Sequence, residues 1–166
     1  ARRIKKEIVL KLPDYTIENL EKNGFCVTSP EDFYNDPFQV LILGPINTPY
    51  EGGYFKMEMT LSTSYPFEQP RAKFITKILH PNISQSNGEV CTRDTMPAWQ
   101  PRMLLPEFII QIRKLLENPK YDIQIGFGLS EKKRGWLECE KTREEKIREC
   151  TLTYAAASRM LAKSAR

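Results

Sequence analysis

The clearest structural signal in this 166-residue chain is the stretch Phe55-Lys56-Met57-Glu58-Met59-Thr60-Leu61. Large apolar side chains alternate here with polar or charged ones, which is the period-two pattern of a strand that buries one face. Three shorter apolar runs predict further strands at residues 24–28, 38–43 and 72–75. Because short connections join these four runs, we expect them to form an antiparallel meander.

An amphipathic helix is predicted ahead of the strands, over residues 2–12. One of its faces is apolar, with such a residue at every fourth position: Ile4, Ile8 and Leu12. Pro13 then ends the helix, because proline cannot donate a backbone hydrogen bond and crowds the preceding turn.

Two more helices are predicted after the strands. Residues 105–117 are strongly apolar, and Pro106 is well suited to the first turn of a helix. Residues 138–161 predict a last helix, which is charged at its start and rich in alanine near its end. We therefore expect a single α+β domain spanning residues 1–166, with the helices packed on one side of the sheet.

The composition is that of a soluble globular protein, with 40% apolar residues, 28% charged residues and a net charge of +4. No apolar run approaches the roughly 20 residues that a membrane span needs, and we expect no secretory signal. Basic residues cluster at positions 2–6 and 132–134, which we interpret as solvated helix faces. Nucleic-acid binding would need a stronger basic stripe with stacking aromatic residues. We expect neither a nucleic-acid nor a membrane partner.

The cysteines predict a reduced, intracellular protein without a metal site. The chain has four of them, at Cys26, Cys91, Cys139 and Cys150. They form no CxxC pair, and His80, the single histidine, cannot complete a mixed Cys/His zinc site of the usual spacing. Disulfides are not expected without a secretory signal. We interpret Cys26, Cys139 and Cys150 as structural thiols.

A long loop holds the residues best suited to chemistry. Residues 76–103 carry three prolines and little periodicity, and a loop of this length within a compact domain is usually functional or disordered. Within it, Cys91 follows His80-Pro81-Asn82 after a short segment. A thiol beside a carboxamide suits chemistry in which sulfur carries an acyl group and an oxyanion has to be stabilised. The same stretch also fits a plain turn.

Six motifs, taken in order, carry a family resemblance. They are Gly44-Pro45-Ile46-Asn47-Thr48-Pro49-Tyr50-Glu51-Gly52-Gly53-Tyr54-Phe55, Tyr65-Pro66-Phe67 with Pro70, Phe74 with Thr76, His80-Pro81-Asn82, Cys91, and Trp99-Gln100-Pro101. Together they strongly resemble the ubiquitin-conjugating enzyme family. The match runs from the first predicted helix to residue 116 and resumes at residues 148–155, which are similar to the last helix of that family. The resemblance implies a UBC-like α+β fold, in which a four-stranded antiparallel meander is flanked by an N-terminal helix, a central helix and one or more C-terminal helices.

The resemblance also implies an activity. An activating enzyme would pass ubiquitin, or a ubiquitin-like modifier, to Cys91 as a thioester. A lysine amine of a target protein, usually presented with help from a ubiquitin ligase, would then take the modifier. ATP would be used by the activating enzyme, so no cofactor is expected in this chain. We expect the protein to work in the cytoplasm, the nucleus or both.

Asn82 and His80 each have two interpretations. The Asn82 carboxamide could donate to the oxyanion that forms during amine attack, or it could brace the loop by bonding to backbone groups; the family assigns both roles to this asparagine. His80 could tie loop backbone together through its two nitrogens. A cysteine-protease pair of His80 with Cys91 is the alternative, but a hydrolase would also need an orienting group and an oxyanion hole. Nothing else in the chain points to a hydrolase.

Amine attack requires a neutral lysine, whose ordinary pKa is near 10.4. An apolar cleft lowers that pKa, and in this family polar or acidic residues beside the cysteine also position and deprotonate the amine. The resemblance puts Ser84 where one such side chain would lie. Asp122 is the nearest acidic candidate after the central helix.

The resemblance also predicts surfaces for protein partners. Arg3 and Lys6 on the first helix, with Phe67 and Pro101 in two loops, match positions at which the family meets its activating enzymes and ligases. Phe67 could instead be an ordinary buried aromatic residue.

The chain departs from the family pattern in three places. The spacing from His80 to Cys91 is one residue longer than usual, which predicts a bulge at residues 84–87. Residues 92–95 are Thr-Arg-Asp-Thr, where aliphatic residues are usual. Residues 118–138 lack the proline- and acid-rich stretch that normally gates the active site. Two rival functions follow. The protein could conjugate a ubiquitin-like modifier, or it could be a catalytically weak family member that serves as a binding subunit. Loss of Cys91 would have been the signature of the second, and Cys91 is present.

Overall fold

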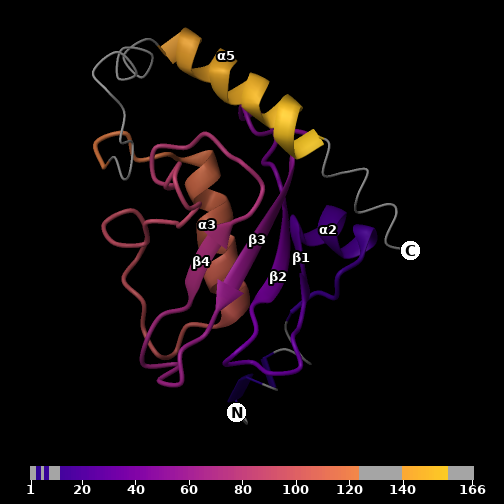
Figure 1. Ribbon diagram of the computed structural model, residues 1–166, viewed down its shortest axis with the longest axis vertical. Coiled ribbons are helices and arrows are strands. Elements are labelled where there is room, and N and C mark those ends of the chain that lie inside the picture. Colours follow the sequence, from indigo (N-terminus) through magenta and orange to yellow (C-terminus); the bar gives the residue numbers. More distant parts are fainter. Residues whose placement is uncertain (1–2, 5, 8–11, 124–139, 157–166) are drawn as a thin grey trace.

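The computed structural model describes residues 3–4, 6–7, 12–123 and 140–156. Figure 1 shows a sheet with helices on both of its faces and a further helix across one end. In chain order the elements are α2 (Ile17–Asn23), β1 (Phe25–Thr28), β2 (Phe38–Leu43), β3 (Tyr54–Thr60), β4 (Arg71–Phe74), α3 (Leu105–Glu117), α5 (Glu140–Cys150) and the π-helical η1 (Thr151–Ala155).

The sheet confirms the predicted meander. Its strands lie in the order β1-β2-β3-β4, and each neighbouring pair is antiparallel. Along β3, Phe55, Met57 and Met59 are fully buried, whereas Lys56 and Glu58 between them are partly exposed. A shift of one residue would turn these apolar side chains to the opposite face, so the alternation fixes the register. Predicted and observed strand ends differ by at most one residue.

α3 covers one face of the sheet and completes the main core (Figure 1). It begins and ends at the predicted residues, with Pro106 in its first turn. Glu107 supports that turn, because its carboxylate accepts a hydrogen bond from the Leu104 N–H at 2.8 Å. The α3 side chains buried against the inward side chains of the strands are Phe108, Ile109, Ile112 and Leu116.

α2 corrects the prediction that the helices pack on one side of the sheet. Its Leu20 is buried with Cys26 and Leu41, which lie on the face opposite to the one that α3 covers. The helix has only seven residues, too few for apolar periodicity to reveal it. Its end signals are nevertheless in the sequence, because the Thr16 side chain caps the first turn and Gly24 ends the helix in the left-handed region at φ 77°.

The first and last predicted helices are described in part. Residues 3–4 and 6–7 are helical, and Ile4 packs in the main core; residues 2, 5 and 8–11 of the predicted helix lie outside the described residues. The last helix is present as α5 and η1, which reach the same core through Ile147 and Ala155. Residues 138–139 and 157–161 of that prediction also lie outside the described residues.

A buried carboxylate joins the first helix to α3. Glu7 is only 3% exposed, and its Oε2 accepts a hydrogen bond from the Leu105 N–H at 2.9 Å, at the start of α3. The same carboxylate accepts from the Tyr65 hydroxyl at 3.0 Å and from Arg3 Nε at 2.6 Å. These bonds offset the cost of burying the charge, and the helix N-terminus adds a favourable field.

We predict that Glu7→Gln lowers the free energy of unfolding by about 1.5–3 kcal/mol, because charged hydrogen bonds in a buried site are lost. Glu117→Gln is the matched control, since Glu117 also pairs with an arginine four residues away, Arg113, but on the surface. It should cost only about 0.3–0.5 kcal/mol. Urea unfolding of both variants measures the difference, and equal losses would contradict a structural role for the buried carboxylate.

Candidate active site

Cys91 follows a turn that is fastened to the open edge of the sheet. The Phe74 N–H donates to the Gly88 carbonyl at 2.8 Å, and the Val90 N–H donates to the Ala72 carbonyl at 3.0 Å, so the chain entering Cys91 pairs with β4. Gly88 has a φ of 78°, and a Cβ at this position would lie 2.1 Å from the Phe74 carbonyl oxygen. Glycine is therefore required where the loop meets the strand.

The Cys91 side chain is half-buried. Its Sγ lies 3.1 Å from the Arg93 carbonyl oxygen, to which the thiol donates, and its own carbonyl accepts from the Thr95 hydroxyl. Residues 92–95, which depart from the family pattern, thus form a local turn that is bonded to Cys91 through Arg93 and Thr95. Burial raises the pKa of the Cys91 thiol, and the nearby Asp94 carboxylate acts in the same direction. The resting group at neutral pH is the thiol.

Asn82 connects Cys91 to the segment that follows α3. Its backbone carbonyl accepts from the Cys91 N–H at 2.9 Å. Its buried carboxamide donates through Nδ2 to the carbonyls of Lys120, at 2.8 Å, and Ile123, and accepts at Oδ1 from the Lys120 N–H at 2.9 Å. The bracing interpretation of Asn82 is therefore what the geometry favours, although the brace extends to residues 120–123 and not only to its own loop.

His80 is buried, and both of its ring nitrogens bond to backbone. Nε2 lies 3.0 Å from the Leu115 carbonyl oxygen, and Nδ1 accepts from the Asn82 N–H at 3.0 Å. This pattern assigns the proton to Nε2. Burial lowers the pKa of His80 to about 4, so the ring is neutral at physiological pH. The geometry favours the loop-bracing role over a cysteine-protease pair with Cys91.

Ser84 and Asp122 lie on different segments. Ser84 is buried, and its Oγ lies 3.0 Å from Ser86 Oγ. It thus braces the turn at residues 84–87, where the extra residue was predicted to produce a bulge. Asp122 is exposed in the turn at residues 120–123, which the Asn82 carboxamide holds. The roles predicted for these two side chains in positioning an amine stay predictions.

The loops that carry Phe67 and Pro101 are joined by Trp99. The indole Nε1 of Trp99 donates to the Pro66 carbonyl at 2.8 Å. Phe67 is 79% exposed, which excludes the alternative of an ordinary buried aromatic residue. Pro101 is exposed as well. An exposed phenylalanine on a fixed loop is a suitable contact for a protein partner.

Arg3 and Lys6 lie on the first helix. The Arg3 guanidinium bonds to Glu7 and also donates through Nη2 to the Met103 carbonyl at 2.8 Å. The first helix is thereby tied to the segment that follows Pro101. Lys6 is exposed. The first helix and the Phe67 loop are therefore both bonded to the segment at residues 99–103, which carries Pro101. The partner roles of these four residues stay predictions.

Within the described residues, no helix has the length and apolar character to cross a membrane. The same part of the chain holds no group of three or more His, Cys, Asp or Glu side chains that could bind a metal ion. Its cysteines are free thiols; burial raises the pKa of Cys26 to about 12, in keeping with a structural role. Cys139 and the basic cluster at 132–134 lie outside the described residues.

Comparison with known proteins now identifies the family. Residues 3–128 match the family model of ubiquitin-conjugating enzymes. The chain belongs to the ubiquitin-conjugating enzyme family. Over 118 residues it is 36% identical to ubiquitin-conjugating enzyme E2 13 of Saccharomyces cerevisiae, covering 71% of this chain and 74% of the relative. It is 35% identical to ubiquitin-conjugating enzyme E2 N of Macaca fascicularis, also over 118 residues, which cover 71% of this chain and 75% of that protein.

A solved structure agrees with the family assignment. A ubiquitin conjugating enzyme E2 domain from Toxoplasma gondii superimposes with a TM-score of 0.73 at 26% identity, covering 93% of this chain and 97% of that one. The predicted UBC-like fold is thus confirmed. The family model ends at residue 128, within the segment 118–138 in which the sequence departs from the family pattern.

Two buried residues with structural roles were not predicted from the sequence: Tyr50, which supports the site, and Glu7, which joins the first helix to α3. The Tyr50 hydroxyl donates to the Leu79 carbonyl at 2.9 Å, and the Tyr50 ring lies 5.7 Å from the His80 ring. Tyr50 was part of a recognised motif, but no local pattern connects it with residues 79–80. Glu7 had a usable signal, since it lies three residues after Ile4 and hence near the apolar face of the first helix.

We predict that alkylation of Cys91 by iodoacetamide accelerates by about tenfold per pH unit between about pH 6 and about pH 8. The reacting species is the thiolate, and its fraction rises by this factor at every pH well below the raised pKa. Peptide mass spectrometry measures the rate at Cys91, with buried Cys26 as the slow internal control. A rate that levels off below about pH 7 would contradict the raised pKa.

Proposed function

We propose that Cys91 accepts ubiquitin from an activating enzyme as a thioester and passes it to a lysine amine of a target protein. The family assignment supports conjugating activity in general. The observation that carries the assignment to Cys91 is its place: a half-buried thiol on a polar loop, bonded through its backbone to the buried Asn82. Thiols that serve only packing are usually fully buried, as Cys26 is.

Loading is a thioester exchange. The Cys91 thiol loses its proton, and the sulfur attacks the carbonyl carbon of the ubiquitin C-terminus, which is bound as a thioester to a cysteine of the activating enzyme. A new S–C bond forms at Cys91, the old C–S bond breaks, and the released thiolate takes up a proton. Because one thioester replaces another, the step needs no strongly activated nucleophile. The raised pKa of Cys91 is compatible with this chemistry and keeps the resting thiol less prone to oxidation.

Discharge is attack by an amine. The lysine nitrogen forms a bond to the same carbonyl carbon, the C–S bond to Cys91 breaks, and the amine proton leaves to a base or to water. Since free lysine is charged at neutral pH, a group beside the thioester has to orient the amine or take its proton. We assign this role to Asp122, which is exposed on the turn that Asn82 holds. Ser84 is a weaker candidate, because its hydroxyl is engaged within its own turn.

Asn82 serves first as a brace in this account. An amide nitrogen has two hydrogens, and here Nδ2 donates to two backbone carbonyls, those of Lys120 and Ile123. Donation to the oxyanion of the tetrahedral intermediate would need one of these bonds to be released. We therefore propose that Asn82 acts on discharge mainly by holding residues 120–123 beside Cys91.

Partner binding is proposed for the exposed residues on the joined segments. Family members interact with ubiquitin, activating enzymes and ligases. The exposed Phe67 lies on a loop that Trp99 bonds to the segment carrying the exposed Pro101, and Lys6 is exposed on the first helix. We propose that these residues, with Arg3, meet the activating enzyme and the ligase.

The test is a loading assay with activating enzyme, ATP and ubiquitin, run on gels with and without reductant. We expect the wild-type protein to form a reductant-sensitive band one ubiquitin heavier. Cys91→Ala should form none, and Cys91→Ser should form a band that resists reductant, because serine gives an oxyester. Cys150→Ala is the matched control and should load normally.

Two other outcomes would contradict the proposal. An adduct that persists in Cys91→Ala would place the acceptor elsewhere in the chain. Failure of the wild-type protein to load ubiquitin would favour a ubiquitin-like modifier, and failure with those modifiers and their activating enzymes as well would favour a binding subunit.

A further inference from the structure

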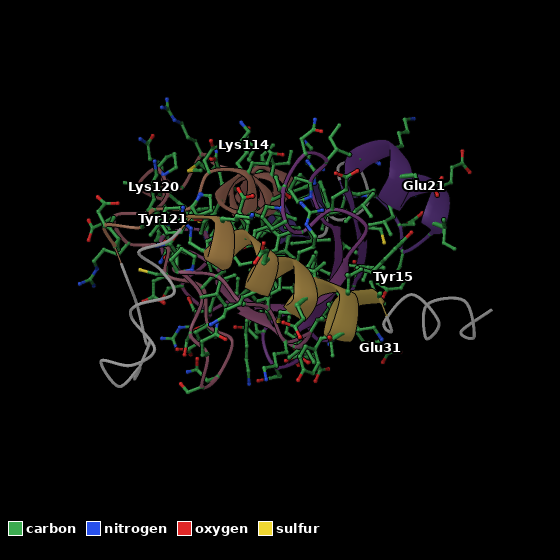
Figure 2. The ribbon with its side chains drawn as sticks, turned by 90° about the horizontal axis from the view of Figure 1, so that it is seen from above. Tyr15, Glu21, Glu31, Lys114, Lys120 and Tyr121 are labelled. Carbon is green, nitrogen blue, oxygen red and sulfur yellow. The ribbon has the colours of Figure 1, made fainter. Side chains whose placement is uncertain are left out.

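The turn at residues 120–123 is held from two directions. From within the domain, the Asn82 carboxamide bonds to the backbone of Lys120 and Ile123. From the other direction, the guanidinium of Arg143 on α5 lies over the ring of Tyr121, with Cζ 3.9 Å from the ring centroid. Figure 2 shows Lys120 and Tyr121 on the side of the molecule where α5 begins. The exposed Asp122 lies between the anchored residues.

The position of Arg143 is set by the docking of α5. Ile147, four residues later on the same helix face, is buried in the main core. Thr151, another four residues on, is also buried, and its hydroxyl donates to the Ile147 carbonyl at 2.9 Å. Arg143 is therefore the first residue of a stripe that faces the domain, and it is half-buried where it meets Tyr121.

The contact between Tyr121 and Arg143 is short enough for a cation–π interaction. A guanidinium within about 6 Å of an aromatic centroid is attracted by the ring face, and the attraction grows when the pair is shielded from water. Both residues are half-buried. Lys120, the chain neighbour of Tyr121, is bonded to the Asn82 carboxamide, and the Asn82 backbone carbonyl accepts the Cys91 N–H, so the pair lies close to the base of the Cys91 loop.

We propose that Arg143 is a positioning residue for amine transfer, which clamps Tyr121 and so holds Asp122 beside the Cys91 thioester. The inference rests on the proposed function, since it concerns the discharge of that thioester. It gives the C-terminal helix a part in the reaction, in a chain whose residues 118–138 lack the usual gate of the family. Because Asp122 acts on the acceptor amine, loss of the contact between Arg143 and Tyr121 should slow discharge to lysine and leave loading unchanged.

The experiment is single-turnover discharge of wild-type and variant proteins that have been loaded with ubiquitin. We expect Arg143→Ala to slow discharge to free lysine by about five- to tenfold, the loss that one shielded cation–π contact can produce. Tyr121→Leu should have the same effect, and Tyr121→Phe should retain more of the rate than Tyr121→Leu because it keeps the ring. The double variant Arg143→Ala/Tyr121→Leu should be no slower than either single variant. Arg148→Ala, an exposed arginine on the same helix, is the matched control and should behave as wild type.

Hydroxylamine separates positioning from general damage. This nucleophile is small and already neutral at pH 7, so it does not need a carboxylate to orient or deprotonate it. We expect Arg143→Ala to discharge to hydroxylamine, and to load from the activating enzyme, at wild-type rates. If Arg143→Ala discharges to lysine at the wild-type rate, the inference is wrong. Equal slowing with lysine and with hydroxylamine, or an equal fall in loading, would also overturn it. If the wild-type protein forms no thioester at Cys91, the proposed function itself fails, and the inference fails with it.

Discussion

The hydrogen bonds of the buried Asn82, from its backbone and its carboxamide, connect the Cys91 loop to the turn at residues 120–123. Its backbone carbonyl receives the Cys91 N–H, and its side chain holds both ends of the turn at residues 120–123. A buried amide without partners would be costly, so either segment can move only if these bonds break. Around this connection, His80 ties the same loop to the end of α3 through Leu115. The site is thereby fixed to the sheet and to the central helix at once.

The parts of the fold that local patterns control could be predicted from the sequence. The alternation at residues 55–61 gave β3 its buried face, and Pro106 with the apolar run after it gave α3 its bounds. α2 could not be found in this way, because seven residues make too little periodicity, and its presence on the second face corrected the predicted layering. Only its caps, Thr16 and Gly24, carried a signal.

The candidate site could likewise be predicted only in part. Cys91, Asn82 and His80 could be selected because they are close in sequence and belong to a recognisable motif. What the motif could not reveal is where the Asn82 amide points, since its partners lie 38 and 41 residues away. The contact of Tyr121 with Arg143 depends in the same way on long-range packing. Such pairs have no local pattern that a single sequence could reveal.

Amide hydrogen exchange of the wild-type protein and Asn82→Ala would show whether the Asn82 side chain holds the turn at residues 120–123. In the wild-type protein the Lys120 N–H, which donates to Asn82 Oδ1, should be protected. In the variant that amide should exchange much faster, while the Phe108 N–H within α3, which donates to the Leu104 carbonyl, should keep its protection. Equal protection of Lys120 in both proteins, or no protection in the wild-type protein, would show that the Asn82 side chain does not hold this turn.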